Sequence, residues 1–190
     1  RQKNMKENQE DVSRLFALLE AGTDNDAYFA ADKLAKVEGE DVLNRLMGLF
    51  SSNNEDTLYL AARALSKLED NGKVLEAVFE LIKTTKNPFL KSVLTESLAG
   101  FDCSEYFVEV FKLYLFGSIK VSAMAKEVLD SQEFAIIPRV IRKARKHYEH
   151  YLHNVKKSDD VFQKMEEVEE MFQTMSDLFE CDDENEEKDL

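Results

Sequence analysis

Apolar residues recur along about two-thirds of the chain with the spacing of an amphipathic helix. They fall at i, i+3, i+4 and i+7, as Leu15, Leu18 and Leu19 begin to do, and residues so spaced share one helical face. Residue types that end helices interrupt this pattern. The interruptions are Gly22-Thr23, Gly39, Ser51-Ser52-Asn53-Asn54, Asn71-Gly72, Asn87-Pro88 and Gly117-Ser118. We therefore predict an all-α protein built from short helices, with Asn87 as a helix cap before Pro88.

The helical pattern is itself repeated four times before Glu133. Four rows of apolar residues in the first helix of each copy recur at steps of 31 or 32 residues, and a fifth row follows in the second helix. The rows are Leu15, Leu46, Val78, Val110; Phe16, Met47, Phe79, Phe111; Leu18, Leu49, Leu81, Leu113; Leu19, Phe50, Ile82, Tyr114; and Leu34, Leu65, Leu98, Leu129. A unit of two antiparallel helices of this length cannot bury its apolar face alone, so it must stack on its neighbours.

Small residues mark the second helix of the first two copies. The positions are Asp26, Ala30-Ala31 and Leu34 in the first copy, and Asp56, Ala61-Ala62, Ala64 and Leu65 in the second. On these residues the segment 8–134 resembles the HEAT-like repeats of the phycobilisome-lyase type. The third and fourth copies have Leu94-Thr95 and Ala125-Lys126 in place of the alanine pair. The resemblance implies a right-handed α-solenoid of about four helical pairs over residues 1–134. Members of this kind are mostly protein-binding scaffolds, with minorities that act on pigments or bind nucleic acid.

A different apolar period begins after Phe134. Two seams share the spacing 4, 3, 4, 3, 4 and are separated by the polar loop Lys156–Asp160. They are Ile137, Ile141, Ala144, Tyr148, Tyr151, Val155 and Val161, Met165, Val168, Phe172, Met175, Phe179. Matched seams joined by a short loop predict a long antiparallel helical hairpin over residues 135–180, which packs on or caps the array. Residues 181–190 are predicted to be a disordered acidic tail.

Charge is unevenly distributed in a chain whose net charge is −13. Residues 159–190 hold fourteen acidic residues and two lysines, whereas Arg139–Lys157 holds seven basic residues and one glutamate. One interpretation is that the basic helix lies beside the acidic one, so that the charges compensate each other. Arg142, Arg145 and Lys146 would then face Glu166, Glu167, Glu169 or Glu170. The alternative is that one block is an interaction segment for a partner.

Second helices usually line the concave surface of such arrays, and residues at i, i+4 and i+8 share a face there. This face gives the candidate partner-binding residues Tyr28, Asp32, Lys36, Tyr59, Arg63, Lys67 and Glu96. Tyrosine and arginine are enriched in binding hot spots, which favours a groove for a protein or peptide. The competing interpretation is a ladder of ion pairs between repeats, in which each exposed pair contributes a few tenths of a kcal/mol.

Few residues suggest chemistry. The three histidines His147, His150 and His153 lie on one predicted helix, where two neighbours could form a weak metal site. Three solvated polar side chains are the simpler interpretation. We find no phosphate-binding glycine loop, nucleophile motif or zinc-type Cys/His spacing, and Cys103 and Cys181 are expected to be reduced thiols. The sequence therefore predicts no enzyme and no cofactor.

These patterns favour a non-enzymatic scaffold or adaptor in the cytoplasm that binds a protein or peptide partner. The alternative is an acidic inhibitor or nucleic-acid mimic that acts on a basic partner through residues 159–190. The acidity of the chain disfavours nucleic-acid binding, which needs a basic stripe. No apolar run is long enough to span a membrane, so no membrane partner is expected. A homodimer through the C-terminal helices is an open alternative.

Overall fold

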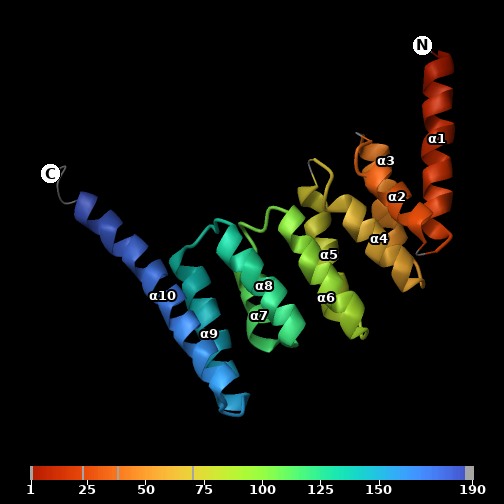
Figure 1. Ribbon diagram of the computed structural model, residues 1–190. Coiled ribbons are helices and arrows are strands. Elements are labelled where there is room, and N and C mark those ends of the chain that lie inside the picture. The colour runs from red at the N-terminus through yellow and green to blue at the C-terminus, as the bar shows by residue number, and fades with distance from the viewer. Residues whose placement is uncertain (1, 23, 38, 70, 187–190) are drawn as a thin grey trace.

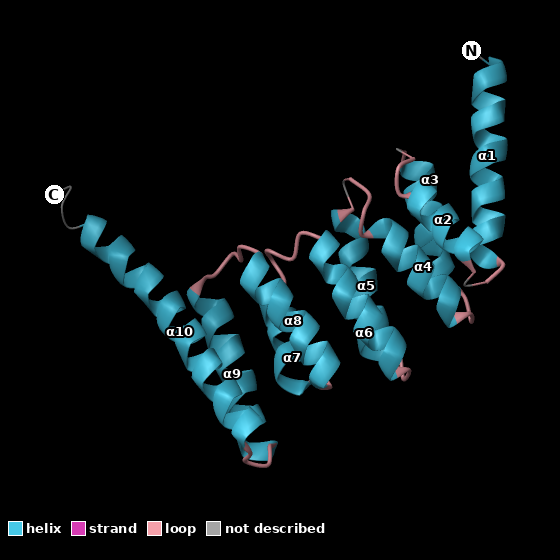
Figure 2. Cartoon of the chain, in the orientation of Figure 1, coloured by secondary structure: helices cyan, strands magenta, loops and turns pink. Residues whose placement is uncertain are grey.

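The computed structural model describes residues 2–22, 24–37, 39–69 and 71–186, with side chains described between residues 9 and 179. These residues form ten α-helices and three 3₁₀ helices, and no strand occurs among them. The α-helices are α1 (Gln2–Glu20), α2 (Asn25–Leu34), α3 (Glu40–Gly48), α4 (Glu55–Leu65), α5 (Leu75–Thr84), α6 (Pro88–Ser97), α7 (Phe107–Phe116), α8 (Ile119–Ser131), α9 (Pro138–Asn154) and α10 (Asp159–Glu186). The 3₁₀ helices are η1 (Leu49–Ser51), η2 (Gly72–Val74) and η3 (Leu98–Gly100). The predicted all-α class is confirmed, and short loops join the helices (Figure 2).

Consecutive helices pack in pairs, α1 with α2, α3 with α4, α5 with α6 and α7 with α8. The second helix of each pair also packs on the second helix of the next, so that α2, α4, α6 and α8 form a continuous series. Figure 1 shows the pairs following one another in chain order, from α1 at one end to α9 and α10 at the other. The apolar rows predicted from the sequence lie in the core between these helices.

Each second helix begins at a polar residue whose side chain caps its first turn. The caps are Asp24, Asn54, Asn87 and Ser118. The Asn87 side-chain oxygen accepts a hydrogen bond from the Phe89 amide at 2.9 Å, and Pro88 is in the first turn, as predicted. Such caps satisfy amide groups that have no partner within the helix. The four second helices therefore begin in the same way, at capping residues 30, 33 and 31 positions apart.

Alanine side chains allow the second helices to lie close together. Ala30-Ala31 in α2 and Ala61-Ala62 in α4 have no exposed surface. In α6 the corresponding residues Leu94 and Thr95 are also buried, and the Thr95 hydroxyl donates to a backbone carbonyl of its own helix. The larger residues of the third copy are therefore accommodated without an unsatisfied hydroxyl.

The end of the third pair is held closely by its neighbours at Gly100. Asn71 Nδ2 donates to the Gly100 carbonyl at 3.1 Å, and Gln132 Nε2 donates to the Phe101 carbonyl at 3.1 Å. A Cβ atom at Gly100 would lie 2.2 Å from the backbone oxygen of Ser66, which is far below van der Waals contact. The close approach of η3 to the end of α4 therefore requires glycine.

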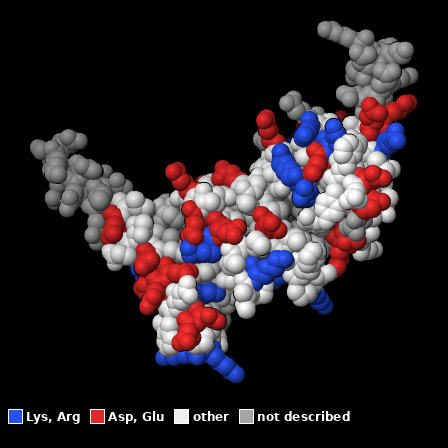
Figure 3. All heavy atoms as spheres, in the orientation of Figure 1, with Lys and Arg blue, Asp and Glu red and all other residues white. Residues whose placement is uncertain are grey.

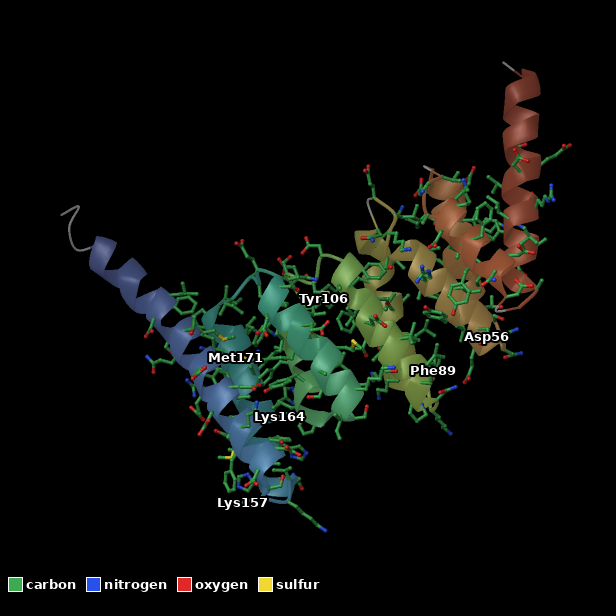
Figure 4. All side chains as sticks on the ribbon, in the orientation of Figure 1. Asp56, Phe89, Tyr106, Lys157, Lys164 and Met171 are labelled. Carbon is green, nitrogen blue, oxygen red and sulfur yellow. The ribbon has the colours of Figure 1, made fainter. Side chains whose placement is uncertain are left out.

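The two C-terminal helices continue the row. Helix α9 packs on α7, and Lys164 of α10 lies at the junction with the α7–α8 pair (Figure 4). Lys164 Nζ donates to the Tyr114 carbonyl and to Ser122 Oγ, both at 2.8 Å. The Tyr114 hydroxyl donates to the Glu167 carboxylate, and Phe172 packs among the aromatic rings of α7 and α9. Polar and aromatic contacts together fix α10 on the preceding helices.

The two apolar seams predicted for these helices are largely confirmed. Their buried members are Ala144, Tyr148, Tyr151, Val161, Val168, Phe172 and Met175. Ile137 differs, because it precedes the first turn of α9 and its side chain is 53% exposed.

The predicted charge compensation between the two helices is not found. Among the described side chains no ion pair joins Arg142, Arg145 or Lys146 to α10. Aromatic rings fill the contact instead, and the Arg145 guanidinium lies 4.4 Å from the centre of the Phe172 ring. Glu167 is turned toward Tyr114.

The boundary of the predicted acidic tail also differs. Helix α10 extends to Glu186, into the segment 181–190 that was predicted to be disordered, and residues 187–190 lie outside the described residues. A helix that has already formed gains one hydrogen bond for each residue added, and glutamate is a good helix former. Both effects favour extension of α10 into the acidic sequence.

Replacing Gly100 with alanine should destabilise the protein. The new methyl group has to displace the backbone of Ser66, and overpacking of this kind costs about 1–3 kcal/mol. The free energy of unfolding, measured by urea denaturation, is the readout.

Gly48→Ala is the matched control. Gly48 has helical φ and ψ of −58° and −29° and open space where a Cβ would lie, so alanine should stabilise by about 0.5–1 kcal/mol through reduced chain entropy. Equal effects of the two substitutions would contradict the close contact at Gly100.

Candidate functional site

Five of the seven predicted groove residues meet on one surface of α2 and α4. Tyr28 and Asp32 come from α2, Tyr59 and Arg63 come from α4, and Lys67 follows α4 directly. We refer to these five residues as the α2–α4 cluster. They come together because α2 and α4 pack side by side and their i, i+4 positions are in register.

An ion-pair network forms the polar half of the α2–α4 cluster. Asp32 Oδ1 lies 3.2 Å from Arg63 Nε and 2.7 Å from Lys67 Nζ, and Asp32 Oδ2 accepts from Arg63 Nη2 at 3.3 Å. Hydrogen bonds from Lys67 and then Arg63 hold the pKa of Asp32 below its usual range. The same contact with Asp32 raises the pKa of Arg63. The carboxylate therefore stays ionised between two cations.

Two tyrosine rings form the other half of the cluster. Tyr28 and Tyr59 meet edge to face with ring centres 6.1 Å apart, and the Arg63 guanidinium lies 5.5 Å from the centre of the Tyr28 ring. Both rings are partly exposed. Burial and the neighbouring Tyr59 raise the pKa of the Tyr28 hydroxyl, which favours its neutral form as a hydrogen-bonding group. The arrangement presents aromatic, cationic and hydroxyl groups together to solvent.

Contacts on this surface agree with both interpretations of the sequence, a binding groove and a ladder of ion pairs. The ion pairs, however, join only α2 and the α4 region. The pairs around Asp32 are ion pairs between repeats, as the ladder interpretation predicts. Glu96 of α6 is exposed and makes no ion pair with Arg63 or Lys67 among the described side chains, so the alternation of charge stops at the second copy. Ser92 of α6 is at the position equivalent to Tyr28 of α2 and Tyr59 of α4. Its side chain is buried, and its hydroxyl donates a hydrogen bond to the Phe89 carbonyl.

A pocket of about 620 Å³ adjoins the α2–α4 cluster. Lys67 belongs to both, and Lys36, the sixth predicted residue, also lines the pocket. The charged lining residues are Lys36, Glu40, Lys67, Glu69 and Lys73. Lys73 Nζ lies 2.6 Å from Glu40, whereas Lys36 is exposed and makes no ion pair among the described side chains. Lys36 therefore offers a cation at the rim.

The three histidines of α9 line two different depressions. His147 and His150 line a depression between α9 and α7, whereas His153 lines a different depression toward α10. His153 Nδ1 donates to the Glu149 carbonyl at 2.7 Å, which satisfies that nitrogen within the helix. Among the described residues no group of three or more His, Cys, Asp or Glu side chains is placed to hold a metal ion. His153 therefore lies apart from His147 and His150, and a weak site formed by two neighbouring histidines stays a prediction.

Cys103 is fully buried, and burial raises the pKa of its thiol to about 12. The thiol is therefore protonated at neutral pH and is a poor nucleophile. The side chain of Cys181 lies outside the described residues.

Sequence reasoning missed the junction of Lys164 with Tyr114, Ser122 and Glu167. Burial lowers the pKa of Lys164 and raises that of Tyr114, whose hydroxyl also bonds to Glu167. These residues come from α7, α8 and α10 and are far apart in the sequence, so no local motif could have indicated the contact. The junction is a structural anchor, because its polar groups bond to one another.

Comparison with protein-family models, with curated proteins and with solved structures finds no match for this chain. None of the described helices is both long enough and apolar enough to cross a membrane.

The ion pair between Asp32 and Arg63 should contribute little to stability. Their side chains are 42% and 32% exposed, and pairs so accessible to solvent are worth about 0–1 kcal/mol. A double-mutant cycle of Asp32→Ala and Arg63→Ala should therefore give a coupling energy below about 1 kcal/mol that decreases with salt. A coupling of about 3 kcal/mol, independent of salt, would show that the network is needed for folding rather than free to serve a surface role.

Protonation of His147 should oppose folding. Burial, then Lys112, His150 and Lys146, lower its pKa below the usual range, and Glu109 opposes them. An unfolded histidine takes up its proton near about pH 6.5, so below that pH the unfolded chain binds more protons and stability falls. Between about pH 7.5 and pH 5.5 the His147→Gln variant should lose less stability than the unaltered chain.

Urea midpoints at the two pH values provide the measurement. His153→Gln, on the exposed side of the same helix, is the matched control and should follow the unaltered chain. A His147→Gln variant with the same pH dependence as that control would contradict the partly buried, cation-flanked position of His147.

Proposed function

We propose that this chain is a non-enzymatic scaffold or adaptor of HEAT-like helical repeats that binds a protein or peptide partner through the α2–α4 cluster and the adjoining pocket. A cytoplasmic location is part of the proposal. It is supported by the resemblance of residues 8–134 to HEAT-like repeats and by the pairwise packing of the helices. An α-solenoid of this kind presents a long surface built from equivalent positions of successive units.

The uneven packing of the two helix layers supports a solenoid with its second helices on the inner side. Helices α2, α4, α6 and α8 pack on one another without interruption, whereas among the first helices only α7 and α9 make comparable contacts. In a curved stack, the layer with the closer contacts lies on the inside of the curve. The α2–α4 cluster belongs to that layer, where a concave binding surface is expected.

The composition of the α2–α4 cluster is the observation that carries the proposal. Partly exposed Tyr28, Tyr59 and Arg63 are held in place by each other and by Asp32. Aromatic and arginine side chains that are already ordered lose little entropy on binding and are enriched in hot spots. Lys36 at the rim of the pocket could pair with an acidic side chain of the partner.

The charge pattern on the face shown in Figure 3 fits a protein partner better than a nucleic acid. Basic and acidic side chains are interspersed on it, and no continuous basic stripe crosses it. Phosphate backbones need such a stripe. The net charge of −13 also disfavours a nucleic acid, because the phosphate backbone is itself negative.

The acidic inhibitor remains a second candidate, because the described acidic side chains of α10 make no ion pair with α9. Glu166, Glu169 and Glu170 are exposed, and no ion pair links them to α9 among the described residues. Deletion of residues 181–190 should leave a scaffold's partner bound, whereas it should weaken an inhibitor sharply and in a salt-dependent way.

Affinity capture of partners from native lysate tests the scaffold. Tyr59→Ala and Lys36→Glu should each remove the captured partner or weaken its binding at least about tenfold, since hot-spot side chains cost about 2 kcal/mol or more when truncated. Isothermal titration with the recovered partner gives the affinity.

Lys33→Glu is the matched control. Lys33 is exposed on α2 and is near Lys36 in sequence, but it is not among the residues that line the pocket. Reversal of its charge should therefore leave partner binding unchanged. A partner that binds both variants and the control equally would contradict the α2–α4 cluster as the binding surface.

A further inference from the structure

A second surface lies between α7 and α9, and the charged residues that line its depression are basic. A depression of about 480 Å³ is lined there by Lys112 and Phe116 of α7 and by Lys146, His147 and His150 of α9. None of these lining residues is acidic. Phe116 is 46% exposed, although it is large and apolar. The depression thus combines cationic groups with an accessible aromatic ring.

Among the described side chains, the basic charge of α9 is not compensated by ion pairs. The sequence led us to expect that α10 would neutralise it, but no lysine or arginine between residues 139 and 157 is in an ion pair among the described side chains. Arg145 stacks on Phe172, and the basic residues of this segment are exposed. In a chain of net charge −13 this cationic surface is available for an anionic partner.

The depression continues into a second one of about 380 Å³ between α5, α6 and α7. The two share Lys112 and Phe116. The second contains the apolar side chains of Phe79, Ile82 and Leu113. Its charged lining residues are the lysines Lys83, Lys91 and Lys112 and the glutamates Glu80 and Glu109. Lys83 Nζ lies 3.5 Å from Glu80, so one of the two glutamates is paired with a lysine of the same depression. Together they could take a short segment that has acidic residues next to an apolar one, which is more than a free phosphate would fill.

The C-terminal end of this chain has that composition. Residues 180–190 contain seven acidic residues and one lysine, and they follow Leu178, whose side chain is 57% exposed on α10. The acidic segment and the basic depression are complementary in charge, and each offers an exposed apolar side chain.

The segment cannot reach the depression of its own chain while α10 is helical. Phe172 of α10 packs on Tyr148 of α9. In the sequence, Tyr148 lies between His147 and His150, the two histidines that line the depression. At about 1.5 Å per residue, the end of α10 at Glu186 lies about 21 Å beyond Phe172 along the helix. The remaining four residues span at most about 14 Å. Figure 1 shows α10 lying beside α9 and its C-terminal part projecting beyond the other helices.

We propose that residues 178–190 of a second copy of this chain dock in the depression between α7 and α9. The acidic side chains face Lys112 and Lys146, and Leu178 packs against Phe116. Each copy has one segment and one depression, so two copies can exchange segments reciprocally and close a twofold dimer. The dimer uses a surface separate from the α2–α4 cluster.

Sedimentation velocity of the full chain over a range of concentrations tests the proposal. We expect association at low salt that weakens at moderate salt, because the contacts are between exposed charges. Deletion of residues 180–190 and the double reversal Lys112→Glu/Lys146→Glu should each raise the dissociation constant at least about tenfold, since several charge contacts are lost together. The double variant Lys33→Glu/Lys36→Glu has the same net charge as the reversal and should associate like the unaltered chain.

A mixture of the two defective chains identifies the occupant. The truncated chain keeps the depression and the charge-reversed chain keeps the segment, so together they should form a heterodimer through one contact although neither associates alone. A full chain that stays monomeric at low salt would overturn the proposal, as would a mixture that does not associate. Association of the truncated chain as strong as that of the full chain would also exclude the segment as the ligand. The Tyr59→Ala variant should dimerise normally, which separates this proposal from the function of the α2–α4 cluster.

Discussion

Close packing of the second helices is the contact on which the rest of the structure depends. No single helical pair of this length can bury its own apolar face, so each pair is stable only against its neighbours. Ala30-Ala31 and Ala61-Ala62 make the close approach of α2 and α4 possible, and Gly100 allows η3 to approach the end of α4. The side chains of Asn71 and Gln132 then satisfy the backbone carbonyls that this approach removes from water.

The surfaces available for binding follow from this packing. Because α2 and α4 are in register, residues that are 31 apart, Asp32 and Arg63, meet across the pairs. The resulting ion pairs are too exposed to add much stability, but they order the side chains beside Tyr28 and Tyr59. Helices α5 and α7 pack less closely on each other than the second helices do, and the depression that contains Phe79 and Leu113 lies between them.

Much of the architecture could be predicted because it depends on local and periodic signals. The apolar rows, Asn87 with Pro88, and the seams of α9 and α10 are all visible as spacing in the sequence. The register of α2 and α4 was also predictable, since the two copies are the most similar. Glu96 is exposed on α6, but among the described side chains it makes no ion pair with Arg63 or Lys67, so its place in the groove stays a prediction.

Features that depend on the three-dimensional direction of long side chains could not be predicted. Charge blocks suggested that α9 and α10 neutralise each other, but aromatic rings occupy their contact and Arg145 stacks on Phe172. The Lys164 junction joins three helices and has no sequence signature. His147, His150 and His153 are close in sequence, yet His153 lines a different depression from the other two. The spacing of residues along a helix shows which of them share a face. Which helices pack on that face depends on the whole fold.

Amide hydrogen exchange of the full chain under native conditions tests most directly whether stability comes from neighbouring pairs. If each pair depends on stacking, amides of the central helices α4 and α6 should be the most protected, with protection decreasing toward α1 and toward the C-terminal half of α10. Equal protection of all helices, or greatest protection in α1, would contradict the account, because the helices would then be stable without their neighbours.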